Sequence, residues 1–167
     1  MGQRRARADR EGHGAEVVSA PTSTGTKNTA PPKPPSRVKV TWAGGQRFDS
    51  GRPGGPTARI DGTGETGQGP VDTLISALAS CAAIDVVEIL AKRRTPVKSL
   101  TVDVLGERVD GIPRRLRHAT LDFHITGDGI EREHAERAID LAINKYCSVK
   151  DSLSKDIPVD WSLKLNQ

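Results

Sequence analysis

The sequence has few aromatic residues and few cysteines, and each shortage excludes a class of function. It contains two Trp, one Tyr and two Phe among 167 residues, which is too few for a platform on which single-stranded nucleic acid could stack. Two cysteines cannot form a four-thiolate zinc site or a disulfide-dense secreted scaffold. No run of 18 consecutive apolar residues occurs, so the sequence predicts no membrane-spanning segment.

Net positive charge and proline are concentrated in the first 36 residues. This segment holds six Lys or Arg against three Asp or Glu, and five of the eleven prolines. Almost no large apolar side chains accompany them, so the segment cannot bury enough surface to offset its ordering entropy. We therefore predict a disordered, basic, Pro-rich tail over 1–36 and one folded domain over 37–167. The net charge of +4 is modest and disfavours nucleic acid as a partner.

The tail does not have the pattern of an export signal. Acidic residues and glycines follow Arg4 and Arg5, where such a signal has an apolar core. A cytoplasmic location is therefore expected.

Hydrophobic periodicity predicts the elements of the folded domain. Apolar residues recur at spacings of three and four from Val71 to Arg93, directly after Pro70, which indicates a long buried helix. Alternating β-branched segments indicate strands, and the Gly-rich segment 61–70 indicates a flexible loop. The expected order is strands 38–42, 46–48 and 57–60, helix 71–93, strands 98–109 and 118–126, helix 132–149 and strand 159–165. This order predicts an α+β fold with mainly antiparallel pairing.

The two cysteines are the residues most capable of chemistry. Cys81 lies within the first predicted helix and Cys147 near the end of the second. Most free cysteines are simply small buried hydrophobic residues, and this interpretation stays open. A zinc site combining the cysteines with His118 and His124 is disfavoured, because no pair has short-range ligand spacing. No metal and no other cofactor is expected.

The segments around both cysteines resemble the OsmC/Ohr family. The first is "SALASCAAIDVVEIL" (76–90) and the second is "AIDLAINKYCSV" (138–149). The hairpin "ERVDGIPRRLRHATLDFHITG" (107–127) and the opening "VKVTWAGGQRF" (38–48) are also similar, so the resemblance spans about 38–165. It implies an OsmC-like fold with antiparallel sheets packed on two central helices, assembled as an intertwined homodimer.

The resemblance also implies a thiol-dependent peroxidase that reduces organic hydroperoxides. Cys81 matches the peroxidatic cysteine, which forms a sulfenic acid, and Cys147 matches the resolving cysteine, which condenses with it to a disulfide. A dithiol, for example a dihydrolipoyl protein, would then regenerate the thiols. The alternative is a non-catalytic, dimeric OsmC-like protein that binds small molecules.

A peroxidatic thiol must ionise, so Cys81 needs a compensating cation. The resemblance implies an arginine held by a carboxylate near the start of the cysteine helix, and Asp72 matches that carboxylate. Arg47 is the candidate cation. Arg108, Arg115 and Arg117 are the other candidates.

Non-catalytic interpretations stay open for two of these residues. Asp72 can be a first-turn residue that the helix dipole favours, and Arg47 can be a solvated residue of a turn. Cys147 lies toward a helix C-terminus, where the dipole disfavours a thiolate, so it is expected to be the slower nucleophile.

Overall fold

The computed structural model describes residues 33–167. The chain divides into two units, Met1–Pro35 and Ser36–Gln167. The tail expected over 1–36 lies outside the described residues, except for its last four positions. All the elements that follow belong to the second unit.

A three-stranded antiparallel sheet opens the domain. It contains β1 (Lys39–Trp42), β2 (Arg47–Gly51) and β3 (Thr57–Asp61), in that order. Trp42 pairs with Phe48, and Phe48 pairs with Ile60, so these three side chains share one face. Trp42 is 65% exposed and Phe48 is 38% exposed. Large apolar surface is therefore left uncovered on this sheet within the described protomer.

The loop after β3 is more ordered than its glycines suggest. The carboxylate of Asp61 is buried and accepts four hydrogen bonds, from the backbone and hydroxyl groups of Thr63 and Thr66 at 2.6–3.0 Å. The Asp61 amide also donates to the carbonyl of Gln68. The predicted loop is present, and the buried carboxylate of Asp61 ties together the segment that leads into the first helix.

Helix α1 (Pro70–Lys92) begins where the sequence predicts. Pro70 occupies its first turn, where a missing N–H has no cost, and Lys92 lies in its last turn. One stripe of the helix is fully buried in the core. This stripe contains Leu78, Ala82, Val86 and Leu90.

By length and composition, α1 is apolar enough to cross a membrane. The prediction of no membrane-spanning segment rests on a different criterion, a run of 18 consecutive apolar residues, and α1 contains no such run. The core helix of a soluble protein also meets the length and composition criterion, and the buried stripe of α1 is of that kind.

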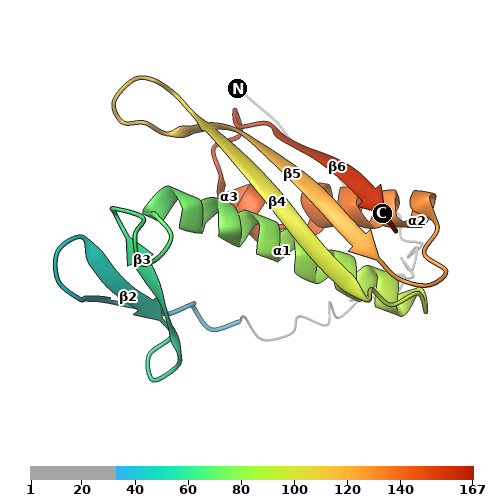
Figure 1. Ribbon diagram of the computed structural model, residues 1–167, viewed down its shortest axis with the longest axis horizontal. Helices are drawn as coiled ribbons and strands as arrows, with labels where there is room; N and C mark the ends of the chain where they lie inside the picture. Colours follow the sequence, from blue (N-terminus) through green and yellow to red (C-terminus); the bar gives the residue numbers. More distant parts are fainter. Residues whose placement is uncertain (1–32) are drawn as a thin grey trace, which may run out of the picture. The chain divides into compact units, whose positions relative to one another are not determined.

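The second sheet covers α1 and α2 (Figure 1). It contains β4 (Ser99–Arg108), β5 (Leu116–Thr126) and β6 (Val159–Leu165), with β5 in the middle. β4 and β5 form an antiparallel hairpin, whereas β5 and β6 run parallel. The sheet is mixed because the chain crosses over through the second helical region before it forms β6. The α+β prediction is confirmed, with this parallel pair as the exception to antiparallel pairing.

The helix expected over 132–149 is interrupted. It is divided into α2 (Arg132–Leu141), a π-helical turn η1 (Ala142–Tyr146) and a short α3 (Ser148–Ser152). The Cys147 amide donates to the Ala142 carbonyl, five residues back, at 2.8 Å. Cys147 itself is extended, with φ −68° and ψ 98°. The expected continuous helix is therefore wrong at the residue that matters most, since Cys147 lies at the break.

Candidate active site

The fold brings together the two cysteines, which are far apart in sequence. Cys81 faces the core from α1 and is half-buried, and Cys147 is 5% exposed. The Cys147 thiol lies 4.0 Å from the carbonyl oxygen of Leu78. Leu78 and Cys81 are three residues apart on α1 and so share a helix face. Cys147 therefore packs against the turn of α1 that carries Cys81, and both thiols are free.

The surroundings of Cys147 disfavour its thiolate. Burial raises the pKa of the thiol, while a hydrogen bond from the Lys150 backbone amide to its sulfur, at 3.3 Å, opposes this rise. Cys81 raises the pKa further, as a hydrogen-bond partner and as a second negative charge when both thiols ionise.

The sequence predicts that the C-terminus of a helix disfavours the Cys147 thiolate. Cys147 follows η1, but it also caps the N-terminus of α3. Desolvation is the first cause of the raised pKa, so the dipole explanation is replaced by burial.

Asp72 and Arg47 lie in different local settings. The Asp72 carboxylate accepts a hydrogen bond from the Gly69 amide at 3.1 Å and so caps its own helix. The Arg47 guanidinium donates to the Gly44 carbonyl at 3.3 Å in the β1–β2 turn. Within residues 33–167, neither side chain forms an ion pair, and the two do not meet.

The other candidate arginines have local partners. The Arg108 guanidinium donates to the Arg114 carbonyl, Arg115 pairs with Asp156, and Arg117 pairs with Glu107. None of these contacts involves either cysteine.

The two histidines of β5 also have local partners. His118 lies near Asp160 and Glu107, and His124 lies near Asp103. Over the described part of the chain, no group of three or more His, Cys, Asp or Glu side chains forms a metal site.

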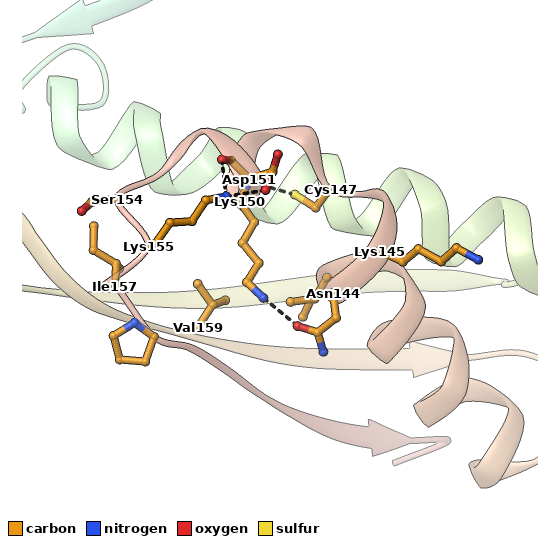
Figure 2. Close-up of a pocket in the computed structure, with 11 residues that line it drawn as sticks. Asn144, Lys145, Cys147, Lys150, Asp151, Ser154, Lys155, Ile157 and Val159 are labelled. Atoms are coloured by element: carbon orange, nitrogen blue, oxygen red, sulfur yellow. Dashed lines mark hydrogen bonds and ion pairs between the residues drawn. The ribbon is translucent and has the colours of Figure 1, made fainter.

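A cavity of about 370 Å³ opens beside Cys147 (Figure 2). Lys150 extends across it and donates to the amide oxygen of Asn144 at 2.6 Å. Lys155 forms an ion pair with Asp151 at the same cavity. We call this space the Lys150 cavity. Its lining includes Ile143, Cys147, Lys150, Asp151, Lys155 and Val159.

Comparison with known proteins identifies the family. Residues 62–162 match the model of the family described as OsmC-like protein. The chain is also 33% identical over 130 residues to Protein YhfA of Escherichia coli strain K12, a match that covers 77% of this chain and 97% of that protein. This chain belongs to the OsmC-like protein family. The family predicted from the cysteine motifs is therefore confirmed.

Solved structures agree with an OsmC-like fold. A hypothetical protein from Aquifex aeolicus is 25% identical with a TM-score of 0.68, covering 81% of this chain and all of that one. An OsmC-like protein from Mycoplasma pneumoniae is 16% identical with a TM-score of 0.67, covering 78% and 96%. OhrB of Bacillus subtilis, an organic hydroperoxide resistance protein, is 16% identical with a TM-score of 0.53, covering 77% and 98%. At these lower identities the likeness establishes the fold.

Sequence reasoning missed two contributors to the surroundings of the thiols. The Lys150 amide contacts the Cys147 sulfur, and the Lys150 side chain enters the cavity beside it. A lysine three residues after a cysteine is not a recognisable sequence signal, since its effect depends on the interruption of the helix at Cys147.

Proposed function

We propose that this OsmC-like protein is a thiol-dependent peroxidase that reduces organic hydroperoxides in the cytoplasm. The observation that carries the proposal is the packing of Cys147 against the turn of α1 that bears Cys81, with the thiols close enough to affect ionisation. A disulfide between them requires their Cα atoms to lie within about 7 Å, or to come there by a modest shift. OhrB of Bacillus subtilis, which shares the fold, is an organic hydroperoxide resistance protein, which is consistent with this proposal.

The proposed reaction has three balanced steps. The Cys81 thiolate attacks one peroxide oxygen and the O–O bond breaks, which leaves Cys81 as a sulfenic acid and releases an alkoxide that takes up a proton from solvent to become an alcohol. Cys147 then attacks the Cys81 sulfur, which releases water and forms the Cys81–Cys147 disulfide. A dithiol, such as a dihydrolipoyl protein, reduces this disulfide and is itself oxidised to a disulfide.

The division of roles follows from burial. Cys147 is nearly fully buried and its pKa is raised, so its thiolate is scarce. Cys81 is more accessible and is flanked by the small residues Ser80, Ala82 and Ala83, which leave room for a peroxide. Cys81 is therefore the better placed to attack, and Cys147 to resolve.

Ionisation of Cys81 would benefit from a nearby cation, and we propose Arg47 for this role with Asp72 as its carboxylate partner. Asp72 lies in the first turn of the helix that carries Cys81. Arg47 has no carboxylate partner among residues 33–167, so its guanidinium is available to another charge. Its contact with Cys81 would require the second subunit proposed next.

We also propose that the protein is a homodimer. Val40 and Trp42 on the first sheet, and Ile84 and Val87 on α1, are large apolar residues that are 41–65% exposed in the protomer. A three-stranded sheet needs an apolar partner on one face to be stable. Such extensive exposed apolar surface is typical of an interface between subunits.

The reaction is tested by treating the reduced protein with one equivalent of cumene hydroperoxide. Mass spectrometry is expected to show a loss of two hydrogens and a peptide that links Cys81 to Cys147. The variant Cys147→Ser should stop at a sulfenic acid that dimedone traps, because no thiol is left to resolve it. The variant Cys81→Ser should consume no peroxide at the catalytic rate.

The alternative of a non-catalytic binding protein gives a different result. Two free thiols after excess organic hydroperoxide would contradict the peroxidase proposal and support that alternative. The pH dependence of Cys81 alkylation discriminates further, since a midpoint well below neutral pH favours catalysis and one above about 9 opposes it.

A further inference from the structure

The Lys150 cavity carries an excess of positive charge. Its lining includes three lysines, Lys145, Lys150 and Lys155, and one carboxylate, Asp151. Lys155 is neutralised by Asp151, whereas Lys150 is held by the neutral amide of Asn144. In the part of the chain from 33 to 167, no carboxylate lies within ion-pairing distance of the Lys150 ammonium. Lys145, which also borders the cavity, extends away from the other side chains in Figure 2.

The size and lining of this cavity suit a small organic molecule. Its volume of about 370 Å³ lies within the usual range for ligand pockets. Apolar side chains from Ile143, Ile157 and Val159 line the space around the ammonium of Lys150. A ligand that combines an apolar chain with one negative group therefore matches both parts of the lining. Cys147 borders the same cavity, so such a ligand would lie beside a redox-active sulfur.

We infer that the Lys150 cavity is the binding site of the reductant, and that this reductant is a small dithiol bearing a carboxylate, which Lys150 recognises. The inference rests on the disulfide of the proposed function and names its reducing partner. A dihydrolipoyl group attached to a protein through an amide lacks this carboxylate, so a free anionic dithiol takes the place of the dihydrolipoyl protein named above as the proposed reductant.

The proposed step is an attack on the Cys147 sulfur. A thiolate of the reductant attacks Cys147, the Cys81–Cys147 bond breaks, and Cys81 leaves and takes up a proton. The second thiol of the reductant then attacks the mixed disulfide, which frees Cys147 and leaves the reductant as a cyclic disulfide. Two electrons pass from the reductant to the protein disulfide.

Burial agrees with this direction of attack. The raised pKa of Cys147 makes its thiolate a poor leaving group, and exchange is faster when the better leaving group departs. The cavity also gives access to Cys147, which is otherwise nearly covered. Attack from the cavity therefore reaches the sulfur that should accept the reductant.

The test compares dihydrolipoate with dihydrolipoamide, which share one dithiol and differ in the charge at the far end of the chain. The protein disulfide is formed with diamide, so its formation does not depend on peroxide. We expect dihydrolipoate to reduce it about fivefold faster, and Lys150→Gln to remove most of this difference. Glutamine keeps a donor for Asn144 but carries no charge.

Lys164→Gln is the matched control, because Lys164 is an exposed lysine of β6 outside the cavity and its loss changes the net charge equally. It should keep the preference for dihydrolipoate. Thermal melts establish that Lys150→Gln is folded. Added acetate should slow the reduction of the disulfide by dihydrolipoate in the wild type. It should have no such effect in Lys150→Gln, because that variant has lost the carboxylate site.

Equal rates for the two dithiols in the wild type would overturn the inference, as would a preference that survives Lys150→Gln. Failure of diamide to form the Cys81–Cys147 disulfide would overturn both this inference and the peroxidase proposal. If the diamide-formed disulfide shows the expected preference but cumene hydroperoxide forms no disulfide, the reductant site stands and the peroxidase proposal fails.

Discussion

Replacing Asp72 separates its capping role from a role in catalysis. In Asp72→Ala, the hydrogen bond from the Gly69 amide at 3.1 Å is lost, which costs about 0.5–1.5 kcal/mol of the free energy of unfolding for an ordinary hydrogen bond. The negative charge near the start of α1 is lost as well, at about 0.3–1 kcal/mol. Alanine returns up to about 0.7 kcal/mol through its higher helix propensity. The expected net loss is therefore about 0.1–2.5 kcal/mol.

The matched variant Asp72→Asn keeps an acceptor oxygen for Gly69 and loses only the charge, so about 0.3–1 kcal/mol should be lost. Urea unfolding at neutral pH and fixed protein concentration measures both values, and the charge contribution should shrink in 1 M salt. The capping argument is refuted if Asp72→Ala unfolds at the wild-type urea concentration, or if Asp72→Asn is the less stable variant. The rate of Cys81 alkylation, measured on the same samples, reports any additional role through an arginine.

Four further results are expected. Asp61→Asn places an amide NH₂ where the carboxylate accepts from Thr63 or Thr66, so Tm should fall by several degrees. The hydrogen bonds to Asp61 hold its pKa well below the usual range, so wild-type stability should decrease as pH falls below about 4 and that of Asp61→Asn should decrease less. Ile84 is 60% exposed in the protomer, and Ile84→Glu should prevent dimerisation, so that light scattering no longer gives a mass of twice 17.9 kDa. A wild-type protein that is a folded monomer would contradict the proposed dimer. Removal of residues 1–36 should leave Tm nearly unchanged, and a loss of several degrees would show that this segment docks on the domain.

Local signals predicted the elements that have strong periodicity. Helix α1 differs from its expected range by one residue at each end, because Pro70 and the cations after Leu90 are explicit start and stop signals. The final strand agrees over 159–165. Both cysteines and the family were recognisable from the sequence, since the two motifs are specific.

The features that were missed depend on contacts between distant residues. No local sequence signal ends a helix at Tyr146. The interruption is visible only in the structure, where Cys147 packs against the turn of α1 that contains Leu78. The order of the loop after β3 depends on the burial of Asp61, and the sequence shows only its glycines. The parallel pairing of β5 and β6 depends on the path of the crossover rather than on either strand.

The π-turn of η1 sets the angular position of Cys147 about the axis of α2. Each residue of an α-helix advances the chain by about 100° and 1.5 Å, and η1 instead closes its hydrogen-bonded ring over five residues, from Ala142 to Cys147. A deletion of one residue between them would restore an ordinary turn and carry the sulfur about a quarter of a revolution away from Cys81. An insertion would rotate it the opposite way. Chain length, more than side-chain chemistry, is therefore the property of 142–146 on which the meeting of the two thiols depends.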